Sequence, residues 1–157
     1  MDDASPSAAH HRRITAQAWS IGIATGAYAL SFGAISVASG LTPWQTQALS
    51  LLMFTGASQF ALVGVLGAGG GAIAAILTAW LIGSRNGLYA LSMAPILRVR
   101  GLRRLGAAQF TIDESTAMAL AHPDPPRASR RAFWMTGLAI YVEYRNSHRG
   151  TRRCCTR

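Results

Sequence analysis

Apolar segments separated by short polar breaks make up most of the chain. The apolar residues run from about Gln17 to Gly40, from about Ala48 to Leu66 and from Ala72 to about Leu97. Each segment has close to the length, about 20 residues, that an α-helix needs to cross a bilayer. A weakly amphipathic stretch (Leu105 to Ala121) and a last apolar run (Ala132 to Val142) follow. The pattern predicts an all-α, polytopic helical membrane protein.

The distribution of charge also favours a membrane location. Residues 14–84 contain no Asp, Glu, Lys, Arg or His. The soluble alternative requires this whole stretch to form a large buried helical core, because soluble surfaces carry charge. A secretory signal peptide is the alternative for the first segment, but the apolar run is too long and no cleavage site stands apart from it. We therefore predict an uncleaved first span.

Three parts are expected along the chain: a polar tail (1–15), a membrane domain (16–142) and a second polar tail (143–157). Thr42 and Pro43 are placed to cap and begin a helix, and the glycine-rich residues 67–71 break the chain. Gly22 and Gly26 have the spacing that lets another helix approach closely. We interpret this pair as a packing face rather than as part of a substrate path.

The basic residues fall in clusters at the edges of the apolar segments. All fifteen are Arg, and the net charge is +9. Such clusters are typical of cytoplasmic loops in membrane proteins. No basic stripe alternates with aromatic residues, so we expect no nucleic-acid partner. The clusters are Arg12 and Arg13, then Arg98, Arg100, Arg103 and Arg104, then Arg127, Arg130 and Arg131.

These clusters conflict with three simple crossings. Three crossings would place the Arg98 to Arg104 cluster on the other side of the membrane from Arg12 and Arg13. The positive-inside rule predicts that both clusters lie on the cytoplasmic side. At least one helix must therefore be broken or re-entrant. The best candidate is Ala72 to Leu97, which is interrupted at Arg85, and the runner-up is the second segment with Gly56 and Ser58 at its centre. Broken helices are where transporters place substrate sites.

Arg85 and the acidic pair Asp113 and Glu114 are the charges to explain. An Arg at bilayer depth should face protein or a cavity, although an interfacial Arg85 is the alternative. Neighbouring helical residues point about 100° apart, so we expect only one of the two carboxylates to face the interior. That carboxylate can exchange protons in transport, or it can simply pair with Arg85 or a loop Arg. Similarly, Ser58 and Gln59 can bind substrate or join two helices.

No feature of the sequence supports an enzyme. A nucleophile–base–acid arrangement is absent, and residues 67–71 lack the Lys-Ser/Thr of a phosphate-binding loop. Cys154 and Cys155 are adjacent in the tail with no His at metal-ligand spacing. His10 and His11 lie in the polar N-terminus, where a solvated tail is expected. We predict neither a metal site nor a cofactor.

Several motifs together resemble the AzlC family of branched-chain amino-acid permeases. They are Gly26-Ala27-Tyr28, Gly40-Leu41-Thr42-Pro43, Gly56-Ala57-Ser58-Gln59-Phe60, Ser84-Arg85-Asn86-Gly87-Leu88-Tyr89 and Ile112-Asp113-Glu114-Ser115. The match covers roughly residues 16–142. Family members often have Asn-Ala-Arg-His where this chain has Gly83-Ser84-Arg85-Asn86.

The resemblance implies the larger subunit of an exporter in the bacterial cytoplasmic (inner) membrane. Its substrates would be branched-chain amino acids such as valine or leucine, and export would be coupled to protons. Its partners would be the lipid bilayer and a small membrane subunit of the AzlD family. Carried over by position, the substrate or coupling candidates are Gly56, Ser58, Gln59, Arg85, Tyr89, Asp113 and Glu114.

After Val142 the chain departs from the family. Family members continue with further apolar helices, whereas residues 143–157 are polar. Read one base over, codons permissible for the segment from Val142 give Trp-Asn-Ile-Gly-Thr, which is similar to how the family continues. We therefore expect a frameshift near Val142. The alternative function is then an inactive permease remnant or a membrane scaffold, and sequencing the DNA around codon 142 distinguishes a shifted frame from a genuine short protein.

Overall fold

Helices build the whole described fold. The computed structural model describes residues 6–123 and 125–154, with side chains described from Ala8 to Arg145 except at position 124. Within these ranges there is no strand, so the all-α prediction is confirmed. The helices are α1 (Pro6–Ala38), α2 (Pro43–Leu52), α3 (Gly56–Gly67), α4 (Ala72–Gly83), α5 (Arg85–Leu97), α6 (Arg103–Phe110), α7 (Asp113–Ala121) and α8 (Pro126–Cys154).

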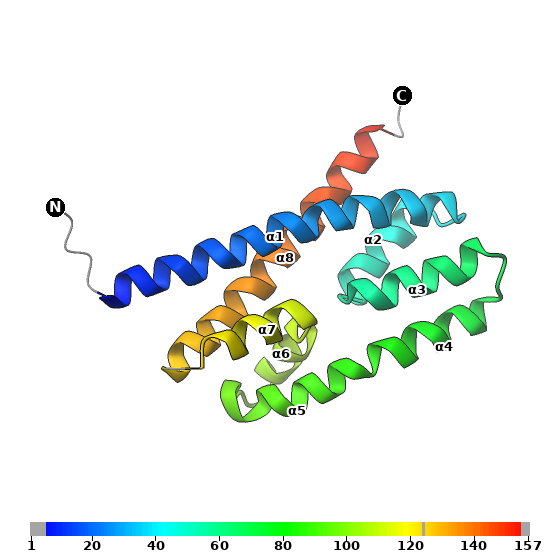
Figure 1. Ribbon diagram of the computed structural model, residues 1–157. Helices are drawn as coiled ribbons and strands as arrows, with labels where there is room; N and C mark the ends of the chain where they lie inside the picture. Colours follow the sequence, from blue (N-terminus) through cyan, green and yellow to red (C-terminus); the bar gives the residue numbers. More distant parts are fainter. Residues whose placement is uncertain (1–5, 124, 155–157) are drawn as a thin grey trace.

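The first helix, α1, runs the length of the molecule (Figure 1). In the described part of the chain it is the one helix that alone has the length and apolar composition of a membrane span, over Ala8–Ala38. The helix begins at Pro6, so residues 6–15 of the predicted N-terminal tail are helical. Proline suits a first helical turn, and the alanines that follow are strong helix formers.

Glycine packing joins α1 to α8. A Cβ added at Gly22 would lie 3.1 Å from the Cβ of Ala139, and one at Gly26 would lie 3.2 Å from that of Glu143. The backbone of α1 therefore approaches α8 more closely than side chains would permit. This confirms the interpretation of Gly22 and Gly26 as a packing face.

The second apolar segment is broken into α2 and α3, which run in opposite directions (Figure 1). Thr42 caps α2 as predicted: its hydroxyl accepts from the Gln45 N–H at 3.3 Å, and the Gln45 side chain accepts from the Thr42 N–H at 2.8 Å. The helix ends at Leu52, and the chain is extended at Thr55 before α3 begins. This pair of helices thus forms a hairpin.

The third segment is a nearly straight pair, α4 and α5, whose junction residue Ser84 keeps helical angles (φ −59°, ψ −26°). The preferred segment is therefore interrupted at Ser84 without a reversal of the chain, whereas the runner-up segment reverses direction between α2 and α3. The polar residues after Gly83 suit a helix interior well enough to continue it, since only Gly87 is a poor helix former. The weakly amphipathic stretch from Leu105 to Ala121 forms two helices, α6 and α7, with a break at Thr111 and Ile112.

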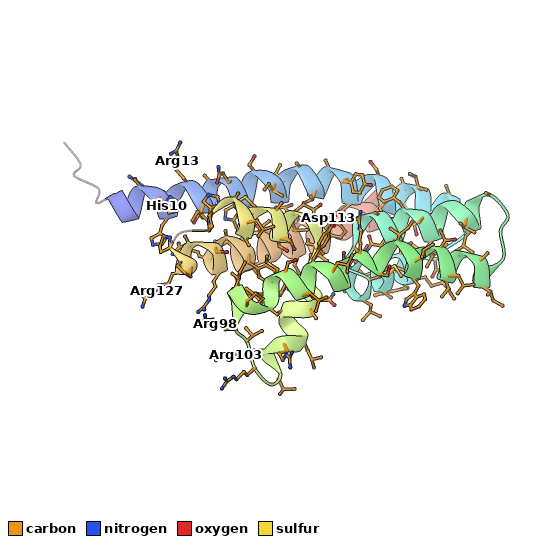
Figure 2. All side chains as sticks on the ribbon, turned by 60° about the horizontal axis from the view of Figure 1, so that its bottom comes forward. His10, Arg13, Arg98, Arg103, Asp113 and Arg127 are labelled. Atoms are coloured by element: carbon orange, nitrogen blue, oxygen red, sulfur yellow. The ribbon has the colours of Figure 1, made fainter. Side chains whose placement is uncertain are left out.

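All three arginine clusters lie towards one end of the bundle. Figure 2 shows Arg13, Arg98, Arg103 and Arg127 there, with Asp113 much farther along the bundle. This arrangement removes the topological conflict, because α1 runs away from that end and α4–α5 runs back to it. The long helix α1 is followed by the hairpin of α2 and α3. The long pair α4–α5, which runs in the opposite direction to α1, is followed by the hairpin of α6 and α7, and α8 comes last.

Candidate functional site

Gln59 of α3 bridges the break between α2 and α3. Its Nε2 donates to the carbonyls of Leu49 (3.2 Å) and Met53, which belong to the end of α2. The Leu49 carbonyl also accepts from the Met53 N–H at 2.8 Å, and the Met53 carbonyl accepts from the Thr55 N–H at 2.6 Å, so Gln59 adds a second bond to each. Gln59 is fully buried, so its amide donors join the two half-helices rather than reach a solvent-accessible site.

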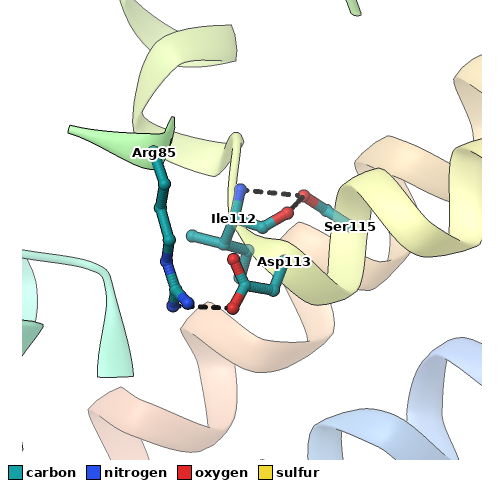
Figure 3. A network of polar contacts seen from close by, with 4 residues as sticks. All are labelled: Arg85, Ile112, Asp113 and Ser115. Carbon is teal, nitrogen blue, oxygen red and sulfur yellow. Dashed lines mark hydrogen bonds and ion pairs between the residues drawn. The ribbon is translucent and has the colours of Figure 1, made fainter. Parts of the chain in front are cut away.

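The break between α6 and α7 is stabilised by short-range hydrogen bonds. The Ile112 N–H donates to Ser115 Oγ at 3.2 Å (Figure 3). Ser115 Oγ also donates to the Phe110 carbonyl. Thr111 Oγ1 donates to the Ala107 carbonyl at 2.7 Å. Thus the side chains of Ser115 and Thr111 supply hydrogen bonds that the interrupted helix cannot.

The two breaks meet in the middle of the molecule. Gln109 Nε2 of α6 donates to the Leu51 carbonyl of α2 at 2.9 Å. The rings of Phe54 and Phe110, one beside each break, have centroids 5.9 Å apart in an edge-to-face arrangement. The tips of the α2–α3 and α6–α7 hairpins are therefore in contact, and the helix ends at these tips face a common region.

A cavity of about 390 Å³ lies at this meeting point. It is lined by five helices: by α1, by the starts of α3, α5 and α7, and by α8. Its volume is within the range of small-molecule sites, roughly 300–1,000 Å³. The lining residues are Ile21, Ala24, Thr25, Tyr28, Thr55, Gly56, Ala57, Arg85, Asn86, Ile112, Asp113, Glu114 and Tyr144.

One ion pair crosses the cavity wall. The Arg85 guanidinium lies 2.7 Å from Asp113 Oδ2, and each side chain keeps about two fifths of its surface exposed (40% and 43%). Figure 3 shows Arg85 reaching from the start of α5 towards Asp113 at the start of α7. The other carboxylate oxygen, Asp113 Oδ1, is buried and has no hydrogen-bond partner. Asp113 Oδ1 is therefore a hydrogen-bond acceptor without a partner at the cavity.

Both acidic residues line the cavity, which corrects the expectation that only one would face the interior. That expectation assumed a continuous helix with one buried face. Asp113 and Glu114 instead occupy the first turn of a re-entrant helix whose tip points into the molecule. Side chains on several sides of such a tip can reach the same space.

The chain's relationship to known proteins agrees with this architecture. The sequence profile of one family, described as AzlC protein, matches residues 20–144, most of the chain. The chain belongs to the AzlC family. Comparison with curated proteins and with solved structures gives no match. The family is associated with the transport of branched-chain amino acids across membranes, which is a transport function rather than an enzymatic one.

Four of the seven predicted site residues line the cavity of this AzlC protein: Gly56, Arg85, Asp113 and Glu114. The other three do not. Ser58 lines a separate space of about 230 Å³ next to Gly83, where its buried Oγ has no hydrogen-bond partner. Gln59 donates to the Leu49 carbonyl and so bridges the α2–α3 break. Tyr89 is half-buried on the second turn of α5 and is not part of the cavity wall.

Sequence reasoning missed two tyrosines at the cavity. A Cβ added at Gly56 would lie 3.2 Å from the Tyr28 ring and 3.5 Å from the Tyr144 hydroxyl. Tyr28 is part of the motif that carries the family resemblance, so that motif was the available signal. Tyr144 is on α8, two residues past the expected departure at Val142 but inside the family match.

The walls of the AzlC cavity combine three kinds of chemistry. Gly56 and Asp113 are the first residues of α3 and α7, so two helix N-termini with positive partial charge converge there. Arg85 adds a full positive charge, and Asp113 and Glu114 add negative ones. The side of the cavity formed by Ile21 and Ala24 is apolar. Such walls can hold an anionic group, a cationic group and an apolar group of one small ligand.

Proposed function

We propose that this AzlC protein is the larger subunit of an exporter of branched-chain amino acids, driven by the proton gradient across the bacterial cytoplasmic membrane. The observation that carries the proposal is the cavity at which two re-entrant hairpins, the Arg85–Asp113 pair and Glu114 meet. Broken helices whose ends face a common cavity are the usual setting of substrate sites in secondary transporters.

The proposed topology has three crossings, made by α1, by α4–α5 together and by α8. The end of the bundle that carries Arg13, Arg98, Arg103 and Arg127 would face the cytoplasm, in agreement with the positive-inside rule. Exposed apolar side chains on α4 favour contact with lipid or with the small AzlD-type subunit. These are Ile73, Ile76, Leu77, Trp80 and Leu81, each more than half exposed.

An amino acid with an aliphatic side chain fits the chemistry of the cavity walls. Its carboxylate would bind at the N-terminus of α3, beside Tyr28 and the Tyr144 hydroxyl that pack at Gly56, and near Arg85. Its ammonium group would bind the unused oxygen of Asp113 or the carboxylate of Glu114. Its aliphatic side chain would pack against Ile21 and Ala24.

Proton coupling would use the two carboxylates. Asp113 already has a cationic partner in Arg85, whereas Glu114 lines the same cavity from the next position of α7. Carboxylates inside membrane proteins are frequent members of proton relays. A proton taken up by Glu114 would neutralise the group that binds the substrate ammonium, and so would favour release of the amino acid.

Resistance to excess valine or leucine tests the proposed function. Cells that carry the full-length gene and its partner should export the amino acid, and Asp113→Asn should lower the export rate about tenfold or more, the size expected when hydrogen bonds to a charged group are lost. Ser92→Ala is a matched control, because this exposed hydroxyl bonds only the Leu88 carbonyl of its own helix. Unchanged export in a strain without the gene would disprove the proposal.

A further inference from the structure

A second cavity lies at the arginine-rich end of the bundle. It has a volume of about 320 Å³ and is formed by the end of α5, the end of α7 and the start of α8. Its walls are largely apolar and include Ile96, Leu120 and Pro126, while Arg98 and Arg130 supply its charged groups. No residue lines both this cavity and the proposed amino-acid site.

Both arginines are anchored through one edge of the guanidinium. Arg130 Nε donates to the Ile96 carbonyl at 2.7 Å, which ties α8 to the end of α5. Arg98 Nε donates to the Pro95 carbonyl at 3.2 Å. A guanidinium presents five N–H donors in a planar fork, so these bonds leave the terminal amino groups for other partners. Anchoring of this kind fixes the position of the positive charges before any ligand binds.

The backbone at Arg98 is strained. Its angles (φ 49°, ψ 35°) are left-handed, and it is the one non-glycine residue with positive φ in the part of the chain that the structure describes. Glycine is the usual residue at such a helix end because it has no Cβ to clash. An arginine at this position therefore makes the fold less stable than a glycine would. The presence of its side chain in the cavity wall is a reason for an arginine here.

The surroundings of the cavity are strongly positive. Arg100, Arg127 and Arg131 are exposed nearby in the sequence, and α8 adds the positive end of its dipole, since Pro126 begins it. The acidic residues that the structure describes lie elsewhere: Asp113 and Glu114 at the first cavity, and Glu143 beside Gly26. Asp124, the remaining acidic residue near this loop in the sequence, is outside the described residues.

We propose that this second cavity binds one anionic phospholipid. Arg98 and Arg130 hold the phosphate, and the apolar wall of Ile96 and Leu120 packs against the beginning of an acyl chain. Basic pockets between membrane helices on the cytoplasmic side are suited to anionic head groups. A free phosphate would satisfy the arginines but would leave the apolar wall exposed to water, so the walls favour a lipid.

Retention of short-chain phosphatidylglycerol by the purified full chain tests this proposal. Native mass spectrometry in a neutral detergent should show one dioctanoyl phosphatidylglycerol bound per chain, and no comparable retention of dioctanoyl phosphatidylcholine. Arg98→Gly and Arg130→Gln should each weaken retention about tenfold or more, because each removes charge-assisted bonds to the phosphate. Arg98→Gly also relieves the left-handed strain, so this variant should fold at least as well as the parent.

Arg13→Gln is the matched control, since it removes an equal charge from the same end of the bundle but from outside the cavity. It should change retention less than about twofold, the effect of a screened surface charge. Equal retention of the two lipids, unchanged retention in Arg98→Gly, or an equal loss in Arg13→Gln would each overturn the proposal. So would displacement of the lipid by inorganic phosphate at the same concentration, because the apolar wall would then contribute nothing.

Discussion

At the scale of single residues, the Arg85–Asp113 pair explains how charge is accommodated in the apolar part of the chain. A lone charge at bilayer depth costs about 3 kcal/mol or more, so each member of the pair reduces the cost of the other. The sequence predicted Arg85 and both carboxylates as candidates and offered pairing with Arg85 as one alternative for them. The structure confirms that alternative for Asp113, with the two groups 2.7 Å apart.

A charge reversal separates a structural pair from a functional one. Arg85→Asp combined with Asp113→Arg should restore much of the thermal stability that either single variant loses, because the attraction is preserved. Export should stay low in the double variant, since the positive charge would then lie at α7 instead of α5. Melting temperature in detergent and leucine efflux measure the two effects. Full recovery of efflux would show that the pair only holds the helices together.

At the scale of helices, glycine spacing predicted packing well, whereas the breaks were harder to predict. The Gly67 to Gly71 run ends α3 as expected, with φ +80° at Gly69, and Thr42 caps α2. The break at Thr55 is followed directly by Gly56, which made this segment the runner-up, whereas the break at Ile112 has no proline or glycine next to it. At the first break a distant group, Gln109, bonds the Leu51 carbonyl, whereas at the second Ser115 and Thr111 bond the nearby backbone. A local pattern cannot show a hydrogen bond between two hairpins.

A larger residue at Gly22 tests the crossing of α1 and α8. Gly22→Leu should destabilise the protein by about 1–3 kcal/mol, the cost of overpacking a close contact, because even a Cβ would lie 3.2 Å from the Ala139 backbone. Gly64→Leu is the control, since a Cβ there meets no atom within 4 Å. Denaturation in mixed micelles measures both. Equal stability of the two variants would contradict the close crossing.

At the scale of the whole molecule, the positive-inside rule predicted a broken or re-entrant helix. The fold contains two helical hairpins, α2–α3 and α6–α7, that can enter the membrane without crossing it. The sequence therefore predicted the fold class and an irregular helix, but it placed that irregularity first in Ala72 to Leu97. The apolar pattern there is interrupted by Arg85, and an interruption by charge looks like a break even when the backbone stays helical at Ser84. Tyr144 reaches the cavity through tertiary packing that no pattern reveals, whereas Tyr28 belongs to a motif that carries the family resemblance.

Cysteine accessibility tests the topology. In a background without Cys154 and Cys155, Ala68→Cys lies between α3 and α4, and Arg100→Cys lies between α5 and α6. Both positions are exposed. A membrane-impermeant maleimide added to intact cells should label Ala68→Cys alone, because these loops lie at opposite ends of the bundle. Labelling of both positions, or of Arg100→Cys alone, would rule out the proposed orientation.

The most direct measurement of the central claim is leucine binding to the purified chain with and without access to the first cavity. Gly56→Val should abolish saturable binding, because its side chain would occupy the space against Tyr28 and cover the N-terminus of α3. Gly64→Val, on the open side of the same helix, should bind leucine as the parent does. If the parent shows no saturable binding, or if Gly56→Val binds leucine as tightly as Gly64→Val, this cavity is not the amino-acid site.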